Sequence, residues 1–101
     1  MATKIRVLVY RPGQPGVVEQ HLNNLDAQQA LVGGYIEAVG MGDNVQLICN
    51  EEGKLKGLPV NFRAPGDVLV GTVFFVRVDE EGECVSITDE DEKRMRKFVG
   101  R

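Results

Sequence analysis

Apolar and polar residues alternate along much of the chain with the period of a β-strand. Clusters of glycine, proline and asparagine separate these runs, and short turns of this kind favour antiparallel hairpins. We expect one hairpin from residues 4–10 and 17–22, and a second from residues 35–39 and 45–50. The first of these runs is apolar on both faces, which predicts an internal strand. Two shorter strands are predicted at residues 54–56 and 84–87.

The longest apolar run, residues 68–76, is apolar on both of its alternating faces. A strand of that kind is buried on both sides, either in the middle of its sheet or at an interface between subunits. Gly71 within the run predicts a bulge or the close approach of another backbone or a ligand. The preceding residues 58–67 contain prolines and a glycine without a clear period, so we expect a loop that is held in place by Val60 and Phe62.

Two segments carry the signals of helices. Residues 25–32 follow a capping asparagine, Asn23 or Asn24, and Gly33 supplies the left-handed residue that ends a helix. Residues 88–99 begin with an approximate capping box, and acidic residues precede basic ones as the helix dipole favours. Together these elements predict an α+β fold, with a mainly antiparallel sheet of about five to seven strands, a short internal helix and a C-terminal helix.

Composition and charge narrow the class of protein. The 101 residues, 43% of them hydrophobic, fit a single domain over residues 1–101. The net charge is −3, and acidic residues gather at 79–83 and 89–92, so we expect no DNA or RNA partner. The first ten residues have neither a signal-peptide pattern nor the length of a membrane span. These features predict a cytoplasmic protein that does not contact a membrane.

The residues available for catalysis are few. His21 is the single histidine, and no serine or cysteine lies near it in the sequence. Cys49 and Cys84 lack the spacing of a metal or redox motif, so we expect them to be reduced residues in or near the core. The chain has neither a phosphate-binding glycine loop nor a metal-ligand spacing. We therefore expect a non-enzymatic protein without a cofactor or a metal.

Ligand-binding residues are predicted around the loop at residues 57–67. Arg63 has the planar fork that recognises phosphate, and the Asn61 amide can read a base edge. Asp67 can accept from ribose hydroxyls or orient Arg63. The alternative is that Asn61 and Asp67 bond to their own backbone in turns while the nearby lysines are solvated. The further candidates are Asn50, Lys54 and Lys56 as polar contacts, and Tyr10 or Tyr35 as a stacking surface.

Four motifs support a resemblance that extends over nearly the whole chain: LVGGYIE at 31–37, CNEEGKLKGLPVN at 49–61, DVLVGTVFFV at 67–76 and SITDED at 86–91. On these motifs the chain resembles a small family known only as a domain of unknown function, which is found in phages, plasmids and other bacterial mobile elements. Phe62 is a departure, because it separates Asn61 from Arg63, two residues that are usually adjacent in that family. The resemblance implies a mobile-element accessory protein and no established activity.

Three hypotheses about function follow. The first is a homo-oligomeric accessory protein that binds and sequesters a small nucleotide-like host immune signal. The second is a protein-interaction module that inhibits a host enzyme or restriction complex, with the acidic residues at 79–83 and 89–92 imitating a polyanion. The third is a hydrolase of such a signal that depends on His21.

Overall fold

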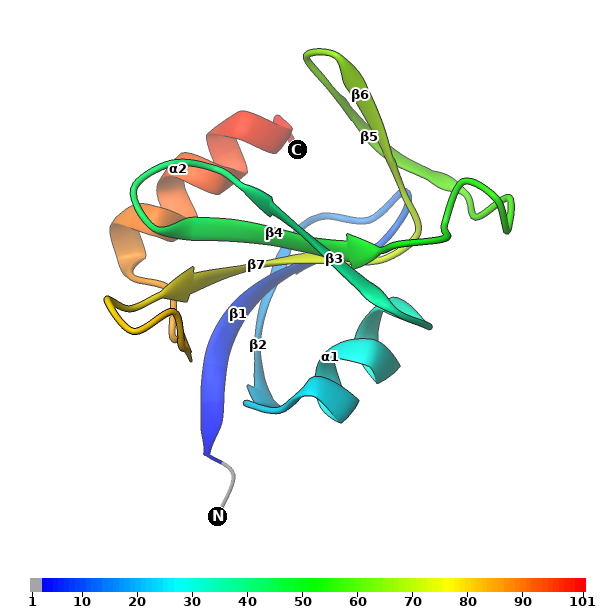
Figure 1. The fold of residues 1–101 in the computed structure, drawn as a ribbon. Coiled ribbons are helices and arrows are strands. Elements are labelled where there is room, and N and C mark those ends of the chain that lie inside the picture. Colours follow the sequence, from blue (N-terminus) through cyan, green and yellow to red (C-terminus); the bar gives the residue numbers. More distant parts are fainter. Residues whose placement is uncertain (1–2) are drawn as a thin grey trace.

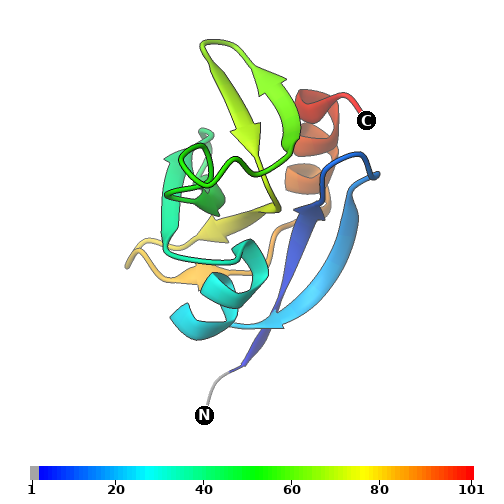
Figure 2. The ribbon, with the colours of Figure 1, turned by 90° about the vertical axis from the view of Figure 1, so that its right-hand side faces the viewer.

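The computed structural model describes residues 3–101 and shows a sheet with one helix on each of its faces (Figures 1 and 2). The elements are β1 (Lys4–Tyr10), β2 (Val17–Leu22), α1 (Leu25–Val32), β3 (Ile36–Gly40), β4 (Val45–Asn50), β5 (Val60–Ala64), β6 (Asp67–Val70), β7 (Val73–Val78), β8 (Cys84–Val85) and α2 (Asp89–Val99). Within residues 3–101 the main sheet has six strands, in the order β2-β1-β7-β4-β3 with β8 beside β7, and β5 and β6 form a two-stranded hairpin. The predicted α+β fold class is confirmed.

All strand pairs are antiparallel, and the two predicted hairpins, β1–β2 and β3–β4, are both present. β1 lies between β2 and β7, as its two apolar faces predicted. β7 lies between β1 and β4, so the long apolar run supplies the central strand of the sheet. Burial on both sides is therefore achieved within one chain for residues 73–76.

Alternate residues of the central strands divide the core into two layers. Leu8, Tyr10 and Phe75 lie in the cluster that α2 and the β5–β6 hairpin cover. Val9 and Phe74 lie in the opposite cluster, to which α1 contributes. Burying an apolar side chain of this size contributes about 1.5–3 kcal/mol, so the alternation of β1 and β7 holds both layers onto one sheet.

Both helices begin and end as predicted. The Asn24 side chain accepts a hydrogen bond from the Ala27 N–H, and Gly33 ends α1 in the left-handed conformation. At the start of α2, Thr88 and Asp91 form a complete capping box, with both hydrogen bonds 3.0 Å long. These caps supply partners for backbone groups that have none inside the helix.

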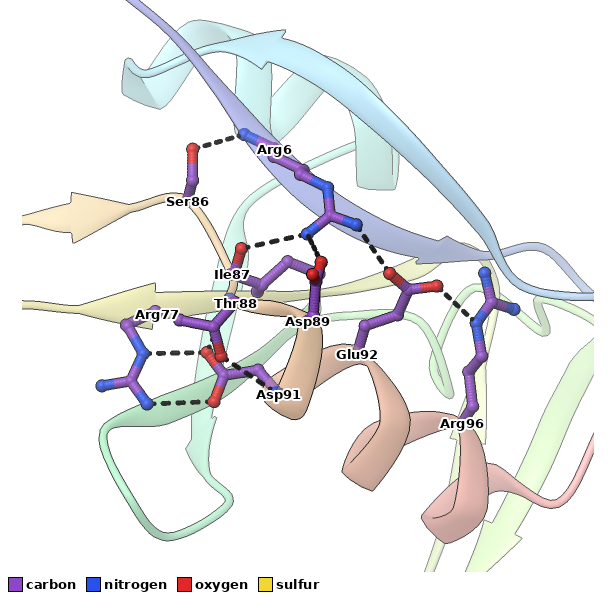
Figure 3. Close-up of polar contacts among 9 residues, drawn as sticks. All are labelled: Arg6, Arg77, Ser86, Ile87, Thr88, Asp89, Asp91, Glu92 and Arg96. Atoms are coloured by element: carbon purple, nitrogen blue, oxygen red, sulfur yellow. Dashed lines mark hydrogen bonds and ion pairs between the residues drawn. The ribbon is translucent and has the colours of Figure 1, made fainter.

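Ion pairs attach α2 to the sheet (Figure 3). The Arg77 guanidinium of β7 donates two hydrogen bonds to the buried Asp91 carboxylate, at 2.8 and 2.9 Å. The next residue, Glu92, accepts from Arg6 of β1 at 2.7 Å and from Arg96 of α2 at 2.9 Å. The hydrogen bond from Arg77 lowers the pKa of Asp91 from 3.8 to about 2, because it stabilises the ionised carboxylate.

The expected continuous strand over residues 68–76 is wrong, because the run is broken between β6 and β7. Gly71 adopts φ +71°, and its N–H donates to the Pro59 carbonyl at 2.7 Å instead of joining the sheet. A Cβ atom on Gly71 would lie 2.7 Å from Cδ1 of Leu58. The predicted close approach at Gly71 is therefore confirmed. The approaching groups are the Leu58 side chain and the Pro59 carbonyl.

Two further strand predictions are corrected. The expected loop at residues 58–67 contains β5, which pairs with β6 through a register shift between Val60 and Phe62. Phe62 is buried as expected, while Val60 is exposed and does not hold the segment by packing. The expected strand at 54–56 is instead a series of turns, in which the Lys56 N–H bonds to the Glu52 carbonyl at 2.9 Å.

Acidification is expected to remove the stabilisation from Asp91. The pKa of Asp91 is lower in the folded chain, so its contribution is fully present above about pH 4 and is lost as the pH falls through about 2. The loss is about 2 kcal/mol, measured by urea unfolding against pH. Asp91→Asn should lower stability at neutral pH and flatten this dependence. Asp89→Asn, at an exposed position in the same turn, should change little, and equal effects would contradict the assignment.

Gly71→Ala is expected to lower the free energy of unfolding more than Gly66→Ala. Both glycines have positive φ, which costs an alanine about 1–2 kcal/mol. At Gly66 an added Cβ meets no atom within 4 Å, whereas at Gly71 it meets Leu58, and crowding adds about 1 kcal/mol. Urea denaturation measures the difference, and equal losses at the two sites would show that the contact with Leu58 has no effect.

Candidate functional site

Two adjoining cavities form a groove between the β3–β4 strands and the β5–β6 hairpin, which Figure 1 shows rising above them. Two cross-strand pairs, Glu37 with Cys49 and Val39 with Leu47, form the floor. Leu69 of β6 lines both cavities and joins them. We name this feature the hairpin groove.

One end of the hairpin groove is apolar and has a volume of about 290 Å³. Val39 and Phe98, which line it, are 37% and 40% exposed although they are large apolar side chains. Leu55, at the opposite end of the groove, is 89% exposed. Exposed apolar residues that gather around one depression are typical of a binding surface. The side chains that line the apolar end are Val39, Met41, Leu47, Ala64, Pro65, Asp67, Leu69 and Phe98.

The other end of the groove, with a volume of about 160 Å³, is polar. The Lys54 ammonium donates to the Asp67 carboxylate at 2.5 Å, and this hydrogen bond raises the pKa of Lys54 and lowers that of Asp67. Both side chains are largely exposed, so their pair contributes little to stability. Glu37 and Glu51 also line this end, which therefore carries three carboxylates and one ammonium. The negative excess favours ligand groups that donate hydrogen bonds.

The thiol of Cys49 lies at the floor of the polar end. Burial and, to a smaller extent, the nearby charges of Glu37 and Asp67 raise its pKa from 9.0 to about 11. Cys49 is therefore protonated at neutral pH and is a poor nucleophile. Both cysteines, Cys49 and Cys84, are free, as expected from their spacing.

Of the predicted ligand-binding residues, the structure brings Asn50, Lys54 and Asp67 together at the polar end. The Asn50 amide is buried, donates to the Val32 carbonyl at 3.2 Å and accepts from the Glu52 N–H at 2.8 Å. Its hydrogen bonds thus shape the turn that carries Lys54. The two predicted lysines differ in position, since Lys56 is exposed outside the groove and its ammonium lies beside Gly34.

Asn61 and Arg63 do not meet at one site. Asn61 is buried, and its amide donates to the carbonyls of Tyr10 and Gly71 at 2.8 and 2.7 Å. Its side-chain oxygen accepts from the Arg101 guanidinium at 2.7 Å. Asn61 therefore joins distant segments, and the alternative of hydrogen bonds within its own turn is wrong. Arg63 is exposed and occupies the position on β5 opposite Val68.

The two predicted stacking residues also lie apart. Tyr10 is fully buried, its ring packs at right angles against Phe75, and its hydroxyl donates to the Arg101 carbonyl at 3.1 Å. Its ring is covered by protein, so the prediction that a base stacks on Tyr10 conflicts with its position. Tyr35 is 65% exposed just before β3 and does not line the hairpin groove.

The hydrogen-bonding partner of His21 among the described residues is a charged side chain. His21 Nε2 lies 2.7 Å from a Glu19 carboxylate oxygen, and Arg11 donates two hydrogen bonds to the same carboxylate. Within residues 3–101, no serine or cysteine lines the depressions beside His21. The described residues also contain no cluster of three or more potential metal-ligating histidine, cysteine or acidic side chains, and no helix long and apolar enough to cross a membrane.

Several acidic residues of the predicted polyanion-like surface are engaged inside the molecule. Asp91 bonds to Arg77, and Glu92 bonds to Arg6 and Arg96 (Figure 3). Asp79 accepts from backbone N–H groups in its own turn. The acidic side chains that remain exposed are Glu80, Glu81, Glu83, Asp89 and Glu90.

Among the groove residues that we did not predict are Glu37, Val39, Leu69 and Phe98. The expected hairpin of β3 and β4 contained a usable signal, since alternate residues of a strand share a face and Glu37 and Val39 lie on one. The position of Leu69 and Phe98 depends on how β6 and α2 pack over that face. Local sequence contains no comparable signal for that packing.

Comparison with known proteins gives one family. The family described as a domain of unknown function (DUF3846) matches residues 5–100, and the chain belongs to it. No curated protein and no solved structure matches the chain.

Cys49 is expected to resist alkylation in the folded chain. A rise of its pKa from 9.0 to about 11 lowers the thiolate fraction at neutral pH about a hundredfold. The test is iodoacetamide labelling followed by mass spectrometry, in a Cys84→Ser variant so that only Cys49 reacts. The labelling rate should rise about a hundredfold or more when urea unfolds the chain. Equal rates in the folded and unfolded states would contradict this description of the groove floor.

Proposed function

We propose that this member of the DUF3846 family is a non-enzymatic accessory protein of a phage or related mobile element, which sequesters a small nucleotide-like host immune signal in the hairpin groove. The observation that carries the proposal is the groove itself, in which an apolar end and a polar end adjoin. The two cavities measure about 290 and 160 Å³, and a single pocket joining them reaches the size of small-molecule sites.

The chemistry of the two ends fits the two parts of a nucleotide. A planar base has an apolar environment against Leu47, Leu69 and Phe98. Sugar hydroxyls donate to the carboxylates of Asp67 and Glu37, which accept hydrogen bonds only. Because carboxylates outnumber the ammonium at the polar end, a phosphate group is expected at the solvent-exposed rim of this end, where the Lys54 side chain lies, and not on its floor.

Lys54 is the group that such a phosphate would meet. Its ion pair with Asp67 is exposed and therefore weak, so exchange of Asp67 for a phosphate oxygen costs little. Lys56 lies outside the groove, with its ammonium beside Gly34, so Lys54 is the lysine that carries this role. This arrangement supports a ligand whose sugar is buried and whose phosphate faces solvent.

Sequestration without turnover agrees with the groups around the groove. The Cys49 thiol is protonated, and His21 does not line either cavity. The mobile-element setting comes from the sequence resemblance, and it suggests that the ligand is a defence signal of the host.

Titration calorimetry with cyclic dinucleotides and ADP-ribose derivatives tests the proposal. We expect heat of binding for at least one ligand and a weakening of tenfold or more in Ala64→Trp, which fills the apolar end. Ala30→Trp adds the same side chain to an exposed position of α1, outside the groove, and should bind as the unmodified chain does.

Three other outcomes would contradict the proposal. Absence of heat and of a thermal shift with every ligand would refute sequestration of this class of signal. Equal binding by Ala64→Trp would place the site elsewhere. A stoichiometric host protein captured by the chain, and lost when Glu80, Glu81 and Glu83 are changed to Gln, would favour inhibition through the acidic surface.

A further inference from the structure

β3 is an edge strand that its own chain hardly covers. Four of its five residues, from Glu37 to Gly40, are exposed, and Ile36 is half-buried. Within residues 3–101, β3 pairs only with β4. An edge strand without proline or lysine presents free N–H and C=O groups to any strand that can align with it.

The hydrogen-bond pattern shows which backbone groups of β3 are free. The Tyr35 carbonyl accepts from the Glu51 N–H, and the Met41 N–H donates to the Val45 carbonyl, each at 2.8 Å. Residues 35, 37, 39 and 41 therefore direct their backbone groups to β4. The N–H and C=O groups of residues 36, 38 and 40 point to the open edge.

We propose that β3 pairs antiparallel with β3 of a second copy about a two-fold axis through Ala38, so that two sheets become one. In this register Ala38 faces Ala38 of the second copy, and Ile36 faces Gly40 on either side. These three pairs join all the free groups in about six hydrogen bonds. The small side chains at Ala38 and Gly40 leave room for Ile36.

Charge selects this register over its neighbour. Moving the pairing by one position toward the start of β3 would place Glu37 directly opposite Glu37 of the second copy, and like charges there are destabilising. In the proposed register Glu37 lies opposite Val39. Moving the pairing by one position toward the end of β3 keeps the two Glu37 carboxylates apart. That register leaves Ile36 without a partner in β3 of the second copy and loses hydrogen bonds.

The same pairing adds to the hairpin groove, the one point that rests on the proposed function. Glu37 and Val39 lie on the groove floor, so Val39 of the second copy would extend the floor beside Glu37. Two grooves would then lie on one face of a joined sheet. β2, the opposite edge, presents Glu19, Gln20 and His21 in sequence and fits an apolar interface less well.

Two proline variants test which edge is used. The Asn23 N–H donates to the Thr3 carbonyl, so alternate residues from 23 back to 17 bond to β1 and the Gln20 N–H points to the open side of β2. The Ala38 N–H points to the open side of β3 in the same way. Proline at either position removes an N–H that its own sheet does not use. By sedimentation of the full chain without ligand, we expect a monomer–dimer equilibrium that Ala38→Pro abolishes and Gln20→Pro retains. A chain that stays monomeric at every concentration, or equal effects of the two variants, would overturn the proposal.

A charge exchange tests the register and does not depend on how Ala38→Pro folds. Val39→Glu places a carboxylate opposite Glu37 twice in each dimer, which should weaken association about fivefold. Adding Glu37→Lys to that variant places opposite charges together and should restore it. A double variant that associates no better than Val39→Glu alone would exclude this register.

Discussion

The hydrogen bonds of the Asn61 side chain are the constraint on which the arrangement of the β5–β6 hairpin depends. This amide joins the end of β1 to the break between β6 and β7, through the carbonyls of Tyr10 and Gly71, and Arg101 completes its set of partners. The Asn61 amide and the two carbonyls that it reaches are buried, and a buried carbonyl that loses its donor costs about 1–3 kcal/mol. Phe62, next in sequence, packs edge-on against Tyr10 and Phe98. The groove beneath the hairpin therefore exists because a polar and an aromatic residue, adjacent in sequence, hold the hairpin in place.

Much of the fold was predictable because its signals are local. The caps at Asn24 and Thr88 depend on residues within one helical turn, and the internal position of β1 follows from its own two apolar faces. The break at Gly71 was predicted only in part. A run that is apolar on both sides reads as one strand, and the left-handed conformation of Gly71 is set by its contacts with Pro59 and Leu58, which are distant in sequence.

The candidate site was harder to predict, because polar residues in an apparent loop do not reveal which way they face. Asn61 and Asp67 are equally plausible in the sequence, yet one is buried and the other lines the groove. The difference lies in partners that are distant in sequence, since the Asn61 side chain bonds to the Tyr10 carbonyl and to Arg101. The acidic residues of α2 show the same difficulty. Asp91 is buried and bonds to Arg77 of the sheet, whereas its neighbour Glu90 is exposed.

The electrostatics of the polar end connect groove shape to ligand choice. Burial and the charges of Glu37 and Asp67 both keep the Cys49 thiol neutral, so the floor holds no thiolate that would repel an anion or attack a ligand. Lys54 lowers the pKa of Asp67, and that carboxylate stays ionised as an acceptor. Because their pair is exposed, the lysine can turn away to another anion at little cost while the acceptor remains in place. A ligand that carries hydrogen-bond donors beside an anionic group can bond to Asp67 and to Lys54 at once. A purely anionic ligand would be repelled by the carboxylates of Glu37 and Asp67.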